Sequence, residues 1–366
     1  MGSPQVLLVG GRSGGHIYAL LAIAETLRAR DPRTAILCVG ERGRMEEDLV
    51  PRAGYDLRTL TMPAGWRGAP RWLGLYRQAK AILAEFAPDI VIGSGGQVCL
   101  PLLLAARRAR RPMILLEPNA IPGRANRLAA RFARPDVIGI LLPAARGCFP
   151  ADLRIEEVGY PLRPELFGQD RGAAMTSLGL DPARRTLLVF GGSQGSGHLN
   201  EVLTAMLPGL KADWATGWQV LHLGGWINAK GLAPEVAAEL TINYHYLPYL
   251  HDMAQALAAA DLVVGRAGAT SLAELAALGL PALLAPLPGL ADNHQWFNAQ
   301  WFGEAGAAVI VPDPELTPQR LETELAALMS NPSRLAAMAA AARGLGKPDA
   351  AARVVALMDE LLERRA

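Results

Sequence analysis

Two glycine-rich turns in the second half of the chain carry residues suited to binding an anion. The first, residues 191–198, follows an apolar run and leads into a helical segment near Leu199. Glycines let a ligand approach the backbone closely, and free N–H groups at a helix start favour an anion. Ser193 adds a hydroxyl donor. The turn has neither the G-x-G-x-x-G spacing nor a following G-K-[ST], so it predicts a phosphate-type turn of another kind. A tight strand–helix turn without a ligand is the alternative.

The second turn, residues 265–274, follows the apolar run 262–264 and also leads into a helix. The N–H groups of Ala269, Thr270 and Ser271, with two hydroxyls, would face a diphosphate at the positive end of that helix. Glu274 lies about one turn further on, where a carboxylate can accept both hydroxyls of a ribose. The alternative is that Glu274 only complements the helix dipole.

Polar side chains gather again in residues 292–299. Gln295 and Asn298 could hydrogen-bond sugar hydroxyls, because amides both donate and accept. In the alternative, Asp292 is simply the N-cap of the helix that follows.

In the first half of the chain, His16 follows Gly14 and Gly15 at a predicted helix start. The positive helix end disfavours imidazolium, so a neutral His16 could take a proton from a hydroxyl nucleophile. The alternative is a histidine that caps the helix or contacts phosphate. Glu117, the acid near the neighbouring strand ends, could orient His16 or the acceptor, or satisfy local backbone donors.

Metal binding is not predicted. The chain has no Asp-x-Asp, and its six histidines show no H-x₃-H spacing. The charge of a diphosphate would then be met by helix ends and basic side chains. Arg163 and Arg266 are placed for this role, although Arg163 could equally be a solvated linker residue.

The elements that must position these residues alternate between β-branched runs and Ala/Leu-rich helical stretches. Strands are predicted at 6–9, 35–39, 57–61, 89–93, 113–116 and 137–141, and then at 186–190, 219–223, 244–249, 262–264, 282–285 and 308–311. Helices are predicted at 16–29, 72–86, 199–210, 251–260, 271–278 and 295–305. Near-continuous apolar strands between helices are typical of parallel sheets covered on both faces. The predicted fold class is α/β, with two Rossmann-like parallel-sheet domains facing a central cleft.

Length and composition fit this organisation. A chain of 366 residues exceeds what one core usually supports. Three parts of the chain are predicted. Residues 1–160 form a domain that would bind the hydroxyl-bearing acceptor and face a membrane, and residues 161–345 form a domain that would bind the diphosphate-bearing donor. A C-terminal helix, 346–366, packs back on the first domain. A net charge of +2 gives no reason to expect nucleic acid as a partner. Three scattered cysteines predict neither a disulfide framework nor a zinc site.

A peripheral membrane contact is the hypothesis for the predicted helix 72–86. No apolar run approaches the ~20 residues of a membrane span, and the N-terminal run is too short for a signal peptide. Helical spacing places one apolar face on this helix, made by Trp72, Leu75, Tyr76, Ala79, Leu83 and Phe86. Aromatic and basic residues flank that face: Trp66, Arg67, Arg71, Arg77 and Lys80. Aromatics beside cations suit an anionic membrane surface, and an ordinary core-facing helix is the alternative.

Taken together, these motifs resemble those of the MurG family, the peripheral membrane glycosyltransferases that convert lipid I to lipid II. Residues 191–195 with Leu199 and Asn200 are similar to the family's G-G-S-Q-G…L-N. Residues 266–274 are similar to R-[SA]-G-A…E, and residues 292–299 to D-x-x-Q-x-x-N-A. The resemblance extends from Val9 to Val354.

The resemblance implies a GT-B fold, UDP-N-acetylglucosamine as donor, no metal or other cofactor, and inversion at the anomeric carbon. It assigns substrate binding to Ser13, Gly14, Gly15, Asn119, Arg163, Ser193, Leu250, Ala269, Thr270, Ser271, Leu272, Ala273, Glu274 and Gln295. Leu250 is expected to contact uracil through its backbone, and Glu274 to contact the ribose. The implied partners are a lipid-linked sugar and the anionic inner membrane surface. The implied location is the cytoplasmic face of the bacterial membrane.

The acceptor side departs from the family pattern. Arg12 stands where the family has glycine, and Ala19 where it has proline. In the H-E-Q-N motif, Leu116 and Pro118 replace the histidine and the glutamine. A GT-B transferase with another lipid or small-molecule acceptor is therefore the alternative function. A UDP-sugar epimerase and a catalytically idle scaffold are rivals of other classes.

Overall fold

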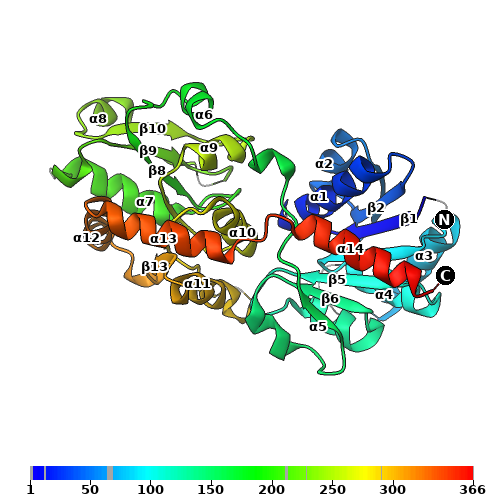
Figure 1. The fold of residues 1–366 in the computed structure, drawn as a ribbon. Helices are drawn as coiled ribbons and strands as arrows, with labels where there is room; N and C mark the ends of the chain where they lie inside the picture. Colours follow the sequence, from blue (N-terminus) through cyan, green and yellow to red (C-terminus); the bar gives the residue numbers. More distant parts are fainter. Residues whose placement is uncertain are drawn as a thin grey trace. The chain divides into compact units, whose positions relative to one another are not determined.

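The computed structural model describes residues 3–11, 14–63, 69–210, 213–227, 229–289 and 291–365. The chain forms two compact units (Figure 1). Unit 1 comprises Met1–Arg163 and Lys347–Ala366, and unit 2 comprises Pro164–Gly346. Ser13, Arg12, Trp66 and Arg67, which the sequence analysis singled out, lie outside the described residues.

Unit 1 is built on a seven-stranded sheet with the order β3-β2-β1-β4-β5-β6-β7. Its strands pair in parallel. Their bounds are β1 Gln5–Gly10, β2 Ala35–Glu41, β3 Asp56–Leu60, β4 Ile90–Gly95, β5 Met113–Glu117, β6 Val137–Ile140 and β7 Ile155–Glu157. The central strands β1, β4 and β5 are buried on both faces, as expected of a parallel sheet covered by helices.

Helices cover this sheet. They are α1 Gly14–Arg30, α2 Glu46–Arg52, α3 Ala69–Phe86, α4 Cys99–Arg108, α5 Arg124–Leu128 and α14 Ala350–Glu363. The last helix, α14, packs against α1 within unit 1. Arg154 fixes α14 through a two-pronged ion pair with Glu360, at 2.8 and 2.9 Å.

Unit 2 repeats the design with a six-stranded parallel sheet of order β10-β9-β8-β11-β12-β13. The strands are β8 Arg185–Phe190, β9 Trp218–Leu223, β10 Asn243–Leu247, β11 Leu262–Gly265, β12 Ala282–Leu284 and β13 Ala308–Ile310. The helices are α6 Arg171–Ser177, α7 Gly197–Met206, α8 Pro234–Ala238, α9 Met253–Ala259, α10 Ala269–Leu278, α11 His294–Glu304, α12 Pro318–Met329 and α13 Pro332–Leu345. The predicted class, two parallel α/β sheets, is confirmed.

The topology explains where a ligand would bind. In both units the chain moves outward from a central strand, reverses, and continues on the other side of that strand. Ligands of such sheets bind beyond the carboxyl ends of the strands near this reversal point. In unit 2 that point lies between β8 and β11, and each of these strands leads into a glycine turn. In unit 1 it lies between β1 and β4.

The apolar face predicted for residues 72–86 packs into the core of unit 1. Leu75, Ala79 and Leu83 of α3 are buried there, and Trp72, Tyr76 and Phe86 pack against the same cluster. This face is therefore not a membrane-binding surface, and the core-facing alternative holds for it. Of the helices that the structure describes, none has both the length and the apolar character needed to cross a bilayer.

Candidate active site

The turn after β8 requires glycine at two positions. A Cβ on Gly191 would lie 2.4 Å from the backbone N of Ser196, and one on Gly195 would lie 2.1 Å from the carbonyl O of Gly224. Gly195 also has a positive φ of +78°. The turn is thus wound tightly against its neighbours, and Ser193 at its tip is exposed. A ligand can reach the Ser193 hydroxyl and the adjacent backbone.

A second segment, residues 224–227, is hydrogen-bonded to this turn through its backbone. The backbone N–H of Trp226 donates to Ser193 O at 3.0 Å, and that of Ile227 donates to Gln194 O at 3.2 Å. The same segment is held to the end of β10, because Gly224 N donates to Leu247 O and Gly225 N to Pro248 O. It therefore links the Ser193 turn to the chain that precedes Leu250.

A buried hydrogen-bond relay fixes residues 224–227 in turn. His222 Nε2 lies 3.0 Å from Asn200 Oδ1, and its Nδ1 lies 2.8 Å from the Tyr244 hydroxyl. Asn200 Nδ2 donates to Gly224 O at 2.9 Å. Burial lowers the pKa of His222 to about 4, so the ring is neutral near pH 7. The sequence analysis missed His222. Asn200, which belongs to a quoted motif, was the available signal.

Arg266 does not have the role expected for it. Its guanidinium is buried and donates to the Ser196 hydroxyl, to Ala285 O and to Asp313. Ser196 is also the N-cap of α7 and accepts from Leu199 N. The amino end of α7 is thus occupied by the protein's own side chains. Arg266 braces the two glycine turns rather than offering its charge to a diphosphate.

The amino end of α10, in contrast, carries no side-chain cap. Its N-cap is Gly268, and the first N–H groups of a helix have no acceptor within the helix. Thr270, Ser271 and Glu274 are partly exposed on the first turns, while Leu272 and Ala273 are buried. Leu272 N already donates to Gly268 O at 3.0 Å. An anion at this helix end would therefore meet Thr270 and Ser271.

The two turns lie beside each other. In the sheet, Phe190 at the end of β8 is paired with Gly265 at the end of β11. The turns that follow these residues leave the same edge of the sheet, and Arg266 joins them through Ser196. Unit 2 therefore places Ser193 and the open end of α10 at one site.

In residues 292–298, Asp292 and Asn298 differ from their predicted roles. Asp292 is not the N-cap of α11, because Asn293 occupies that position, and both residues have positive φ, 56° and 52°. Asn298 is wholly buried and donates to Ala267 O, so it cannot reach a sugar. Gln295 Oε1 accepts from Leu287 N at 2.9 Å, which leaves its amide N–H groups for a ligand.

In unit 1, His16 lies on the first turn of α1 against Gly95 of β4. A Cβ on Gly95 would lie 2.6 Å from His16 Cε1, so only glycine lets the ring occupy this place. Burial lowers the pKa of His16 to about 4, and a smaller opposite effect comes from its hydrogen bond with the Ser94 backbone. The ring is therefore neutral at physiological pH; the sequence predicted neutrality from the helix end, whereas the structure attributes the lowered pKa to burial.

His16 shares a pocket of about 220 Å³ with Glu117 and Asn119. The carboxylate of Glu117 accepts hydrogen bonds from Asn119 N and Nδ2, from Gly123 N and from Asn126 Nδ2. Burial raises the pKa of Glu117 to about 7 even though these donors act in the opposite direction. Glu117 thus holds residues 119–126 in place by hydrogen bonds. These residues form one wall of the pocket that also contains His16.

Arg163 is the last residue of unit 1, and its guanidinium lies 4.3 Å from the centre of the Tyr18 ring on α1. Gly14 and Gly15 open the same helix. Among the described residues there is no cluster of three or more His, Cys, Asp or Glu side chains that could hold a metal ion.

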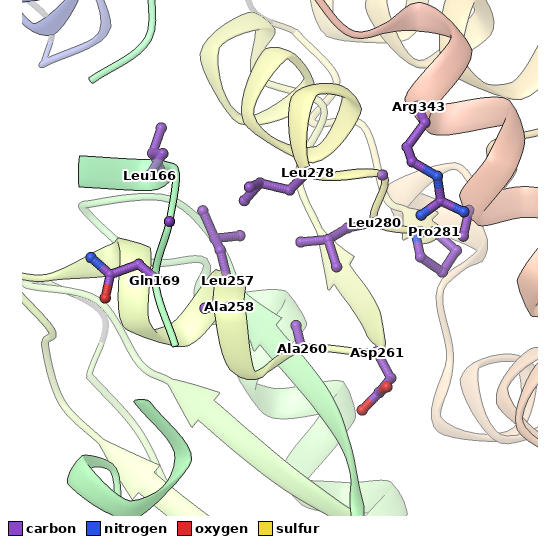
Figure 2. A pocket seen from close by; sticks show the side chains of 13 residues that line it. Leu166, Gln169, Leu257, Ala258, Ala260, Asp261, Leu278, Leu280, Pro281 and Arg343 are labelled. Carbon is purple, nitrogen blue, oxygen red and sulfur yellow. The ribbon is translucent and has the colours of Figure 1, made fainter. Parts of the chain in front are cut away.

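A larger pocket of about 350 Å³ lies at the opposite edge of the unit 2 sheet, where α9 and α10 end (Figure 2). Leu257, Leu278 and Leu280 line it together with Arg343. Its acid, Asp261, is already paired with Arg171 at 2.6 Å and accepts from Thr186 N. Because sheets of this kind bind ligands at the carboxyl ends of their strands, we do not place the substrate in this pocket.

Comparison with known proteins agrees with the two-unit architecture. The glycosyltransferase family 28 N-terminal domain matches residues 6–136, and the family 28 C-terminal domain matches residues 186–354. A solved structure of MurG from Acinetobacter baumannii superposes with a TM-score of 0.77 at 27% identity. That match covers 98% of this chain and 100% of the other. The predicted GT-B fold class is thereby confirmed.

Two curated relatives are similar along nearly their whole length. Both are named UDP-N-acetylglucosamine--N-acetylmuramyl-(pentapeptide) pyrophosphoryl-undecaprenol N-acetylglucosamine transferase. The one from Desulforudis audaxviator is 37% identical, with 98% of each chain covered. The one from Paenarthrobacter aurescens is 39% identical, with 97% of this chain and 96% of the relative covered.

Proposed function

This chain belongs to the MurG family of N-acetylglucosaminyltransferases, and we propose that it transfers N-acetylglucosamine from UDP-N-acetylglucosamine to a lipid-linked muramyl-pentapeptide, converting lipid I to lipid II. In this proposal unit 2 binds the donor, and unit 1 supplies the acceptor site and the general base. The observation that carries it is the uncapped amino end of α10 beside the exposed Ser193 turn.

The donor would be held without a metal. Its diphosphate would lie at the N–H groups and hydroxyls of Thr270 and Ser271, where the helix dipole favours negative charge. Ser193 would donate to the same group, and Arg163 would add positive charge. Glu274 would accept from the ribose hydroxyls, Leu250 would contact the base, and Gln295 would donate to the sugar. Leu272 and Ala273, being buried, would contribute only the helix that carries their neighbours.

The reaction would be a single displacement. A hydroxyl of the acceptor sugar attacks the anomeric carbon while the bond from that carbon to the diphosphate oxygen breaks. UDP leaves with the electron pair, stabilised electrostatically by the end of α10. The hydroxyl proton passes to neutral His16. The roles of Ser13, Gly14, Gly15 and Asn119 would be to bind substrate beside His16, with Glu117 holding the wall that contains Asn119.

The donor can be identified by calorimetry with UDP-, ADP-, dTDP- and GDP-sugars, followed by transfer assays with lipid I. We expect binding of UDP-N-acetylglucosamine in the presence of a chelator, and transfer to lipid I. Glu274→Ala should weaken donor binding by roughly 10- to 100-fold, because a hydrogen bond to a charged group contributes about 1.5–3 kcal/mol. Glu304→Ala, at the carboxyl end of α11 and outside the proposed site, is the matched control.

Three results would count against this assignment. They are equal binding of ADP-sugars, loss of binding on chelation, or Glu274→Ala behaving like Glu304→Ala. If lipid I were not a substrate and the sugar were instead transferred from the donor to another hydroxyl compound, the alternative acceptor would be supported. Turnover of UDP-N-acetylglucosamine to an epimer without acceptor would replace transfer altogether.

We also propose that unit 1 docks on an anionic membrane surface at the cytoplasmic face of the bacterial membrane. Unit 1 contains 27 Lys and Arg against 18 Asp and Glu, a net charge of +9, whereas unit 2 has 9 against 16, a net −7. On α3, Leu73, Arg77 and Lys80 are exposed at helical spacing that places them on one face. This face is distinct from the apolar one buried in the core.

Charge reversal on α3 tests the membrane proposal. Arg77→Glu with Lys80→Glu should reduce flotation with phosphatidylglycerol-containing vesicles roughly tenfold or more, since each basic residue near such a surface contributes ~1 kcal/mol. Arg320→Glu with Arg334→Glu on unit 2 is the control and should float like wild type. Equal binding of the wild type to vesicles of phosphatidylcholine alone would contradict an electrostatic contact.

A further inference from the structure

A large exposed aromatic side chain lies at the proposed donor site of unit 2. Trp226 is 70% exposed, and Ile227 beside it is 68% exposed. Both follow β9 at the carboxyl edge of the sheet. The Ser193 turn and the amino end of α10 lie at the same edge. Exposed apolar side chains of this size call for a partner, because tryptophan usually hides most of its surface.

Trp226 is in contact with both segments that are assigned to the nucleotide, the one for its diphosphate and the one for its base. On one side its N–H donates to Ser193 O at 3.0 Å, in the turn assigned to the diphosphate. On the other side its ring packs edge-on against Tyr249, with ring centroids 5.2 Å apart. Tyr249 directly precedes Leu250, which is assigned to the base. Trp226 thus contacts both the turn assigned to the diphosphate and the residue next to the one assigned to the base.

The ring is held in place but is not covered. A T-shaped pair engages only part of each ring, and the contact with Tyr249 has an interplanar angle of 86°. Tyr249 is itself steadied by an edge contact with His251 at 4.9 Å. Because a backbone hydrogen bond and the contact with Tyr249 already restrict Trp226, stacking on the remaining face would cost little conformational entropy.

We propose that Trp226 stacks on the nucleobase of the bound donor and so contributes to nucleotide affinity. This inference rests on the proposed function, because it takes the ligand to be a nucleoside diphosphate sugar. A planar base is the part of such a ligand that an aromatic face recognises. Ile227, although equally exposed, has an aliphatic side chain that offers no planar face for stacking.

Calorimetric titration of Trp226→Ala with UDP and with inorganic pyrophosphate tests the stacking. The backbone bond to Ser193 remains in this variant, so only the ring is lost. We expect UDP binding to weaken about 5- to 100-fold, the range that base stacking on aromatic side chains supports, and pyrophosphate binding to stay unchanged. Trp226→Phe should recover part of the loss. Ile227→Ala, equally exposed and equally bonded to the turn, should bind both like wild type.

Other outcomes would overturn the inference. Unaltered UDP affinity in Trp226→Ala would show that the ring does not touch the base. An equal loss for UDP and pyrophosphate would show that the ring acts through the Ser193 turn. Normal UDP affinity with lost binding to acceptor or vesicles would assign Trp226 to a different occupant. If the wild type bound no uridine nucleotide at all, the proposed donor would fail first, and that result is distinct from the other three.

Discussion

Replacing His16 with Ala should lower kcat by a factor of about 10²–10⁴, the range that positioned general bases supply. The affinity for UDP should stay within about twofold, because this substitution removes a proton acceptor in unit 1 and not a donor contact in unit 2. The reason is the neutral imidazole in the pocket shared with Glu117 and Asn119. Single-turnover rates with lipid I and UDP calorimetry measure the two quantities separately.

The pH profile gives this prediction a second readout. With the pKa of His16 lowered to about 4, the free enzyme keeps its base unprotonated at any pH well above 4. The acidic limb of kcat/KM, which reports the free enzyme, should therefore fall near pH 4. An anionic acceptor beside the ring would favour imidazolium, so the acidic limb of kcat should lie at higher pH. His16→Ala should lose both limbs.

A conservative variant separates proton transfer from hydrogen bonding. His16→Asn keeps a polar side chain but cannot accept the proton, so it should be as slow as His16→Ala. Tyr160→Phe removes a hydroxyl 3.5 Å from His16 Nδ1 and should have a far smaller effect. Activity restored by Asn, or donor binding lost in His16→Ala with the chemical step intact, would refute the assigned role.

The central strands could be predicted from the sequence because parallel sheets bury them on both faces. Runs such as residues 6–9 and 187–190 are apolar without interruption, and the structure buries all of their side chains. The strand β7 was missed because it is short, lies at the sheet edge and has no buried residue. A strand of three residues is too short to show the apolar run or the alternation by which longer strands are recognised.

The glycine turns were likewise predictable, because each combines a strand end with a helix start in the local sequence. What the local sequence could not show is which side chains the fold itself uses. Arg266 reaches Ser196 and Asp313, which lie 70 and 47 residues away in the chain. Asn298 belongs to a polar cluster by sequence, yet the packing of α11 buries it completely. Such pairings depend on tertiary contacts that no spacing rule encodes.

The departures on the acceptor side limit how far residue roles could be transferred. Leu116 is wholly buried in β5. The position where the family motif has histidine therefore lies in the core of this protein and not in the pocket. Glu117 keeps its place at the strand end and organises residues 119–126. The pocket proposed for the acceptor thus retains His16, Glu117 and Asn119 although the motif around them has changed.

Glu117 should make the protein less stable as the pH rises. Its pKa is raised from the usual 4.5 to about 7 in the folded protein, so the folded state binds the proton more tightly than the unfolded chain does. Stability from this group is complete below pH 4.5 and is lost as the pH rises through 7. A shift of this size corresponds to about 3 kcal/mol of unfolding free energy.

Glu117→Gln should remove this pH dependence, because the amide does not titrate. One amide oxygen can still accept from Asn119, but the amide N–H₂ would face Gly123 N and the side-chain amide of Asn126, which are donors. We therefore expect a pH-independent loss of about 1–3 kcal/mol from unmade hydrogen bonds. Urea denaturation from pH 4.5 to 7.5 measures the difference between the two proteins at each pH. Glu85→Gln on the exposed side of α3 should keep the wild-type slope. Parallel curves for wild type and Glu117→Gln would show that burial does not raise the pKa of this carboxyl.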